Sequence, residues 1–107
     1  MNNSVEKGKT IAIIAYMTII GSVIAIIMNN DEKNTFASFH NRQGLGTWLT
    51  LFILGYPVGY FDSWTITLGL YIFIFVLWMY GFLGALQGKM NITPILGPLY
   101  QKVFKSL

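Results

Sequence analysis

The stretch FASFHNRQGLG, residues 36–46, holds the single histidine of this 107-residue chain, His40, and its single arginine, Arg42. An imidazole can act as a general base, and a guanidinium can bind phosphate or carboxylate groups. A catalytic histidine also needs a nucleophile or a second acid beside it, and no cysteine or glutamate lies within this stretch. We therefore predict no catalytic residue and a protein that is not an enzyme.

Metal and cofactor chemistry has no support in the sequence either. Cysteine is absent, and one histidine cannot supply the several ligands that a protein-bound metal needs. The segment QGLGTW lacks the preceding strand and the lysine of a phosphate-binding loop. No Asp, Glu or Lys lies deep in an apolar segment, so an ion or proton relay has no carriers. We predict no metal and no cofactor.

The polar stretch has two open interpretations as a helix. One face of that helix would carry Phe36, Phe39, His40, Gln43 and Thr47. Arg42 would lie on another face, so polar groups surround the axis and the stretch suits the headgroup layer better than hydrocarbon. The first interpretation is a structural cap and anchor for the apolar segment that follows. The second is a binding site for a lipid headgroup, a peptide or a partner subunit, made of Phe36, Phe39, His40, Arg42 and Gln43.

The composition indicates an integral membrane protein. Hydrophobic residues make up 54% of the chain and charged residues 10%, against roughly 25% charged residues in soluble domains. The net charge of +3 comes from single basic residues without a basic stripe, so we expect no nucleic-acid partner and favour contact with anionic lipid. The length allows one membrane domain, residues 1–107.

Three apolar segments predict an all-α fold with three transmembrane helices, at about residues 10–28, 35–61 and 64–86. The first segment has 19 residues, which span about 28 Å as a helix, close to the hydrocarbon thickness. It is too long for a signal peptide and lacks a cleavage site of small residues. Pro57 and its flanking glycines end the second segment, and FDSW is a tight connection to the third. Segments two and three should therefore be antiparallel.

The tail predicts an interfacial amphipathic helix over about residues 98–107, because Pro94 and Pro98 stop a continuous helix from the membrane. Its apolar face would carry Leu99, Tyr100, Val103, Phe104 and Leu107. A frayed, solvated terminus is the alternative. The predicted contacts to lipid headgroups are Lys89, Lys102 and Lys105.

The basic residues predict the orientation. With three crossings, five basic residues lie on the side of the 29–44 loop and the C-terminus, and two lie at the N-terminus. The positive-inside rule places the loop and the C-terminus in the cytoplasm, with the N-terminus on the other side of the membrane. A hairpin broken at Gly21 and Ser22 would bring every basic residue to one side. We prefer the straight helix, because lipid penalises an exposed turn.

Small residues predict where the helices pack, since they let helix backbones approach closely in lipid. The predicted packing positions are Ala15, Thr18, Ser22, Ala25, Gly46, Thr50, Gly81, Gly84 and Gly88. The same positions could instead form a dimer interface. The opposite faces, rich in Ile, Leu and Phe, should face lipid.

The stretch FASFHNRQGLG before one helix and GALQGKMNITPILG after the last resemble a group of small bacterial membrane proteins. These are similar to the twenty-kilodalton subunit of the chloroplast inner-envelope protein translocon. The shared positions are Phe36, Phe39, His40, Arg42, Gln43 and Gly44, then Gly88, Lys89, Pro94 and Gly97. The resemblance implies a link to protein translocation. The plastid proteins are expected to have four membrane helices, whereas this sequence predicts three.

We therefore predict a small inner-membrane protein that acts as an accessory binding or assembly subunit in protein transport. Its partners would be membrane lipids and either another membrane protein or itself. A self-assembling homo-oligomeric channel is the alternative, and the small-residue positions would then be its oligomer contacts.

Overall fold

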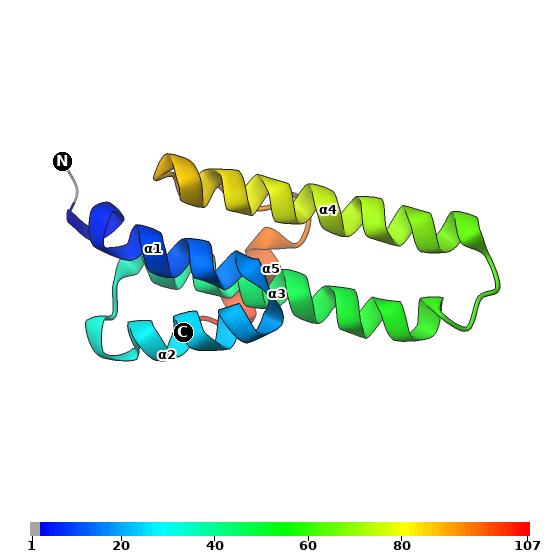
Figure 1. Cartoon of the computed structure of the whole chain (residues 1–107), viewed down its shortest axis with the longest axis horizontal. Coiled ribbons are helices and arrows are strands. Elements are labelled where there is room, and N and C mark those ends of the chain that lie inside the picture. Colours follow the sequence, from blue (N-terminus) through cyan, green and yellow to red (C-terminus); the bar gives the residue numbers. More distant parts are fainter. Residues whose placement is uncertain (1–2) are drawn as a thin grey trace.

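The computed structural model describes residues 3–107, and these residues form an all-α fold without strands. The five helices are α1 (Asn3–Met17), α2 (Ile19–Glu32), α3 (Thr35–Val58), α4 (Trp64–Gln87) and α5 (Gly97–Val103). The molecule is elongated, 49 × 22 × 22 Å, with α3 and α4 running along its long axis (Figure 1). The predicted all-α fold class is confirmed.

The first apolar segment folds as a helical hairpin. The chain leaves the α-helical conformation at Thr18, where φ is −156° and ψ is 175°, and α2 then runs back beside α1 (Figure 1). The Thr18 hydroxyl accepts a hydrogen bond from the Gly21 amide at 2.9 Å and so caps α2. Gly21 is required there, because a Cβ at that position would clash with the carbonyl oxygen of Ile14.

The prediction of one helix over residues 10–28 is therefore wrong. The alternative hairpin describes the chain better, although the break falls at Thr18 rather than at Gly21 and Ser22. Composition did not indicate the break, because the segment is apolar throughout and contains no proline. As a result the start of α1 and the α2–α3 connection lie at the same end of the molecule (Figure 1), so the prediction that they lie on opposite sides is also wrong.

The α3–α4 pair is antiparallel, as predicted from the short connection. Each helix has 24 residues, about 36 Å of helix. The Asn34 side chain caps α3, Ser63 caps α4, and Gly88 ends α4 with φ at 72°. The α1–α2 hairpin covers only part of the length of the pair (Figure 1).

Among the described residues, α4 alone is long and apolar enough to cross a membrane. The segment 10–28 is divided between two shorter helices, and α3 begins with the polar stretch of residues 36–43.

Helix α5 lies across α3 instead of continuing from α4. It begins one residue before the predicted helix and ends at Val103. The Tyr100 ring packs on α3 at Gly46, where a Cβ would overlap it. The turn before α5 holds Ile95 at φ 66°, a left-handed conformation that is rare for a β-branched residue. Of the predicted apolar face, Tyr100 is buried whereas Leu99 and Val103 are exposed.

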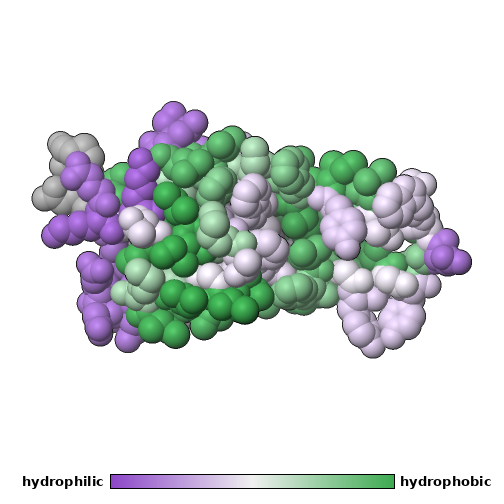
Figure 2. Space-filling model, in the orientation of Figure 1, coloured by the Kyte–Doolittle hydropathy of each residue, from purple (hydrophilic) through white to green (hydrophobic). Residues whose placement is uncertain are grey.

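Polar side chains lie inside the bundle, and many large apolar side chains lie on its surface. The buried polar residues are Ser22, Asn29, Ser38, His40, Asn41, Gln43, Thr47 and Thr93. Exposed large apolar residues occur on α2, α3 and α4, and Figure 2 shows them over the middle of the face drawn. Hydrophilic residues gather at the end that holds the N-terminus (Figure 2).

Two glycines of α3 provide a matched test of this packing. Gly44→Ala should lower the free energy of unfolding by about 1–3 kcal/mol, because the new Cβ would press against the backbone of Ala15 in α1. At Gly55 a new Cβ would meet open space, so Gly55→Ala should raise the free energy of unfolding by about 0.5–1 kcal/mol. Thermal or denaturant unfolding in detergent measures both. Equal effects of the two variants would contradict the packing of α1 on α3.

Candidate functional site: a buried polar cluster

The predicted binding residues lie inside the bundle. Phe36, His40 and Gln43 are each at most 1% exposed, Phe39 is 8% exposed, and Arg42 is half-buried. They lie in the first turns of α3, which contacts α1, α2, α4 and α5. A partner therefore cannot reach Phe36, His40 or Gln43 as a surface contact, and that part of the binding-site interpretation does not fit the structure.

Both ring nitrogens of His40 are hydrogen bonded. The Nε2 atom lies 2.8 Å from the carbonyl oxygen of Lys89, which can only accept, so Nε2 carries a proton and donates. The Nδ1 atom lies 2.7 Å from the hydroxyl oxygen of Tyr16. In the neutral imidazole Nδ1 accepts this bond and Tyr16 donates it. Neither nitrogen is left for a substrate or a metal.

Gln43 uses both ends of its amide. Its Nε2 atom donates to the Tyr16 hydroxyl at 3.2 Å and to the carbonyl oxygen of Asn91 at 2.9 Å. Its Oε1 atom accepts from the Thr93 amide at 2.8 Å. Gln43 therefore holds the backbone that follows α4 against α3 and also completes the hydrogen bonds of Tyr16. We call His40, Gln43 and Tyr16 the polar cluster.

Aromatic rings enclose the imidazole. The rings of Phe36, Phe39 and Tyr16 lie edge-on to His40, with centroids 4.7, 5.1 and 5.5 Å away. These rings exclude water, which strengthens hydrogen bonds that are made and raises the cost of any that are lost.

Arg42 points to α5 and not into the polar cluster. Its Nε and Nη2 atoms donate to the carbonyl oxygens of Phe104 and Lys105 at 3.2 and 3.0 Å, and Nη1 donates to Oε1 of Gln101 at 3.1 Å. The amide nitrogen of Gln101 in turn donates to the Phe39 carbonyl at 2.9 Å. Arg42 thus satisfies carbonyls at the end of α5 and fixes that helix to α3.

Tyr100 provides a second link between α5 and α3. The Thr50 hydroxyl donates to the Gly46 carbonyl at 2.7 Å, so it accepts the 2.6 Å bond from the Tyr100 hydroxyl. Burial raises the pKa of Tyr100, which keeps its hydroxyl protonated and able to donate.

The predicted packing positions have different roles. Ala15, Ser22 and Ala25 are fully buried in the hairpin and against α3. Gly46 and Thr50 contact Tyr100 of α5, as described above. Gly81 lies against the Tyr16 ring, and Gly84 lies against the backbone of Lys89. Thr18 and Gly88 differ from the prediction, because Thr18 is an exposed helix cap and Gly88 terminates α4.

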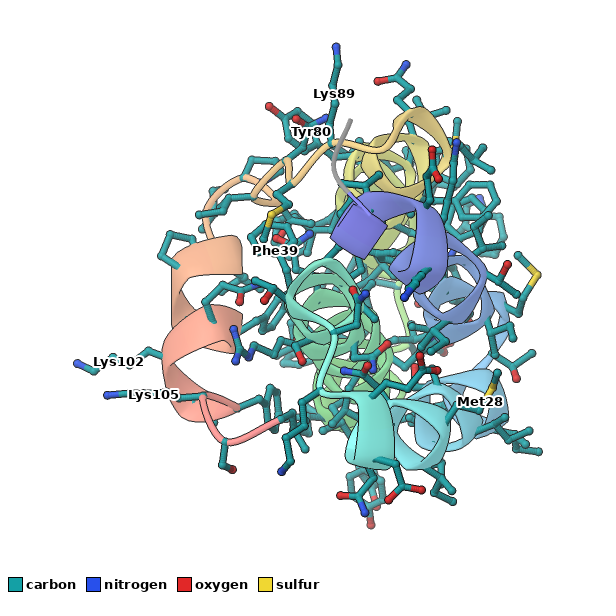
Figure 3. The ribbon with its side chains drawn as sticks, turned by 90° about the vertical axis from the view of Figure 1, so that its left-hand side faces the viewer. Met28, Phe39, Tyr80, Lys89, Lys102 and Lys105 are labelled. Atoms are coloured by element: carbon teal, nitrogen blue, oxygen red, sulfur yellow. The ribbon has the colours of Figure 1, made fainter. Side chains whose placement is uncertain are left out.

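The predicted headgroup lysines, Lys89, Lys102 and Lys105, are all exposed, and Figure 3 shows Lys102 and Lys105 pointing away from α5 on the same side. No group of three or more His, Cys, Asp or Glu residues suitable for a metal occurs in the part of the chain that the structure describes.

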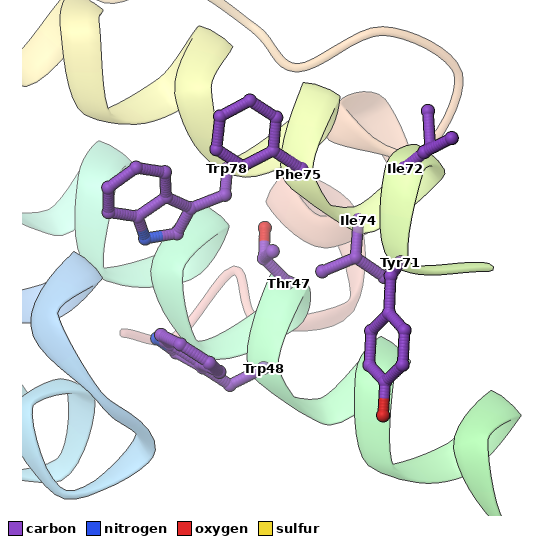
Figure 4. Close-up of a pocket in the computed structure, with 7 residues that line it drawn as sticks. All are labelled: Thr47, Trp48, Tyr71, Ile72, Ile74, Phe75 and Trp78. Carbon is purple, nitrogen blue, oxygen red and sulfur yellow. The ribbon is translucent and has the colours of Figure 1, made fainter. Parts of the chain in front are cut away.

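An apolar groove lies between α3 and α4 beyond the tip of the hairpin (Figure 4). Its volume is about 520 Å³, and its lining is Thr47, Trp48, Tyr71, Ile72, Ile74, Phe75 and Trp78. The Thr47 hydroxyl already donates to the Gln43 carbonyl at 2.8 Å. The groove therefore offers almost no polar group to a ligand.

Sequence reasoning missed Tyr16 and the backbone of residues 89–93 as parts of the polar cluster. Tyr16 lies within an apolar run, and a tyrosine in such a run needs a partner for its hydroxyl, which was the available signal. The backbone groups of residues 89–93 carry no signal in the side-chain sequence.

Comparison with known proteins gave no match. No protein-family model fits the chain, and neither a curated protein nor a solved structure is significantly similar to it.

Gln43→Met tests the polar cluster, because methionine keeps the size of the side chain but cannot replace its three hydrogen bonds. It should lower the free energy of unfolding by about 2–3 kcal/mol, since the Thr93 amide and the Asn91 carbonyl lose their partner. Proteolysis within residues 88–97 should become faster. Gln87→Met, at the exposed end of α4, is the matched control and should have little effect. Equal stability of the two variants would contradict a structural role of Gln43.

Proposed function

We propose that this chain is a non-catalytic, multi-pass subunit of a bacterial inner membrane that binds and assembles with another membrane protein. In this proposal α4 crosses the bilayer and α3 crosses beside it, with the polar first turns of α3 enclosed by α1, α2 and α5. The α1–α2 hairpin enters and leaves from the cytoplasmic face as a re-entrant element, in place of the third crossing expected from the sequence.

The observation that carries the proposal is the distribution of apolar side chains. Soluble monomers rarely expose apolar patches larger than a few hundred Å². Here large apolar side chains are exposed along α2, α3 and α4, and only 17% of the most apolar stretch of α4 is buried. Hydrocarbon or the apolar surface of another membrane protein would be a suitable environment for them.

Aromatic side chains at one tip support a membrane boundary there. Tyr56, Tyr60 and Trp64 are 71–75% exposed around the α3–α4 connection. Tyrosine and tryptophan concentrate at the boundary between hydrocarbon and headgroups. Asp62 is the only charged residue near this tip.

The distribution of charge supports the orientation. All seven basic residues lie in the first turns of α1, in the α2–α3 connection, in the first half of α3 or after α4. No basic residue lies in the α3–α4 connection or beside it. With the hairpin re-entrant, the N-terminus, the 29–44 segment and the C-terminus all face the cytoplasm, and the positive-inside rule is obeyed without conflict.

Side chains supply partners to several backbone groups at the hairpin tip, which lowers the cost of a turn in lipid. Ser22 donates to the Ala15 carbonyl at 2.6 Å, and the Trp78 indole donates to the Tyr16 carbonyl at 2.7 Å. Thr18 caps the first turn of α2. These bonds supply partners to backbone groups that helix ends leave unsatisfied.

An assembly role is favoured over catalysis and over a self-assembled channel. Both nitrogens of His40 are engaged, so the residue with the most obvious catalytic chemistry is structural. Ala15, Ala25 and Gly81 are covered within the monomer, so they are not free for oligomer contacts. The exposed side of α4 is the surface that we assign to a partner, and a link to protein translocation follows only from the sequence resemblance.

Single cysteines test the topology, because the chain has no cysteine of its own. We expect Glu6→Cys and Asp31→Cys to react with an impermeant thiol reagent only from the cytoplasmic side, and Asp62→Cys only from the opposite side. All three positions are exposed. Labelling of Glu6→Cys and Asp62→Cys from the same side would contradict the re-entrant hairpin.

The mass of the complex after extraction in mild detergent tests the assembly role. We expect a mass that is not a multiple of the 12.1 kDa chain and that returns to the monomer mass in a harsher detergent. Multiples of 12.1 kDa alone would favour the homo-oligomeric channel. A monomer under all conditions would contradict both functions.

A further inference from the structure

A second polar site lies apart from the polar cluster, between the end of α2 and the C-terminal residues. It is a pocket of about 220 Å³ lined by Ile26, Asn29, Asn30, Lys33, Arg42, Lys105, Ser106 and Leu107. The side chains of this lining bring basic and neutral polar groups together and include no carboxylate. The side chains of the pocket therefore carry a net positive charge.

Arg42 provides the fixed charge of this pocket. Each of its three nitrogens donates one hydrogen bond, and all three acceptors are neutral oxygens. A guanidinium has five N–H donors, so two remain, and the bonds that are made hold the group in place. A fixed, partly buried guanidinium without a carboxylate partner is suited to an oxyanion, and phosphate matches its geometry.

Lys33 provides the second charge. It ends α2 with φ at 48°, a left-handed conformation that glycine or asparagine usually adopts at this position. Its backbone amide donates to the Asn29 carbonyl, so the side chain is the part of Lys33 that can serve a ligand. The Asn29 side chain is occupied by Asn34 and Ser38, which leaves Asn30 and Ser106 as further donors in the lining.

The surface next to the pocket is apolar. Ile20, Val23, Ile24 and Ile27 of α2 are 45–68% exposed and follow a helical spacing that places them along one face. Ile27 of this face lies one helical turn before Asn30 of the pocket lining, and Ile20 lies beside the tip of the hairpin. An electropositive pocket at one end of an apolar face suits a ligand with an anionic head and hydrocarbon tails.

We propose that this pocket binds a phosphate group through Arg42 and Lys33, and that the phosphate belongs to an anionic membrane phospholipid whose acyl chains lie along α2. The position of the acyl chains rests on the proposed membrane placement, whereas binding of the phosphate rests only on the pocket. The bound lipid would bridge α2 and the C-terminal residues, so its loss should loosen the docking of α5.

Lipid binding to the delipidated full chain in detergent tests the proposal. The probes are phosphatidic acid, diacylglycerol with the same acyl chains, and inorganic phosphate, measured by native mass spectrometry and by the shift in thermal midpoint. We expect one saturable adduct with phosphatidic acid and none with diacylglycerol. Equal binding of diacylglycerol would overturn the proposal, and inorganic phosphate binding as tightly as phosphatidic acid would overturn its lipid part.

Variants locate the site. Lys33→Gln should weaken binding of phosphatidic acid about tenfold, as expected for the loss of one charge-assisted bond. Arg42→Gln should do so at least as strongly. Lys7→Gln removes the same charge from an exposed lysine at the start of α1, outside the pocket lining, so it is the matched control and should keep its affinity. Equal losses in Lys33→Gln and Lys7→Gln would show adsorption to basic surface and overturn the site.

The lipid-binding measurement distinguishes the site for two reasons. If Arg42→Gln also loosens α5, Lys33→Gln still decides, because the Lys33 side chain has no structural hydrogen bond to lose. The adduct is counted on the isolated chain, so the result does not depend on a protein partner or on topology. The proposed assembly role could therefore fail while the lipid site holds, or the reverse.

Discussion

The structure depends on one requirement, which is that the side chains of the polar cluster, enclosed among apolar helices, find hydrogen-bond partners inside the same chain. His40, Gln43 and Tyr16 meet this requirement together. Because these residues also bind the backbone of residues 89–93, they connect α1, α3 and the segment after α4. An unpaired buried group costs about 1–3 kcal/mol, so each partner makes the position of the others more favourable. The position of α5 follows from this arrangement, since the chain reaches α5 only through residues 89–93.

The same requirement explains why α1 and α2 form a hairpin that stops part of the way along the α3–α4 pair. A helix end leaves carbonyl and amide groups without partners. At the tip, Ser22 and Trp78 donate to carbonyls of α1, and Thr18 caps α2. Small residues allow this close approach, since Ala15 and Ala25 are fully buried. The hairpin then brings Lys7 and Lys9 of α1 to the same end of the molecule as Lys33.

Much of the helical architecture could be predicted from sequence, whereas the break at Thr18 and the roles of the polar stretch could not. Asn34, Ser63 and Gly88 are local signals, and α3 and α4 begin or end beside them. Next to the break at Thr18, Ser22 and Trp78 donate hydrogen bonds to the carbonyl oxygens of Ala15 and Tyr16. A hydrophobicity pattern does not encode these bonds. Helical geometry correctly separated His40 and Gln43 from Arg42. It could not show that backbone carbonyls would bind His40 and Arg42, because every residue type has the same carbonyl.

The separation of His40 from Arg42 gives neighbouring residues opposite roles. His40 is fully buried, both of its nitrogens have partners within the chain, and the surrounding rings exclude water, so it cannot serve a ligand without unfolding its surroundings. Arg42 is half-buried, and neutral carbonyl oxygens fix its guanidinium but leave its charge without a carboxylate partner. Because neutral acceptors already hold the guanidinium in the folded chain, the side-chain entropy of Arg42 is lost during folding and not during binding. This favours binding of an anion. Two turns of α3 therefore combine a closed structural cluster with an open electropositive one.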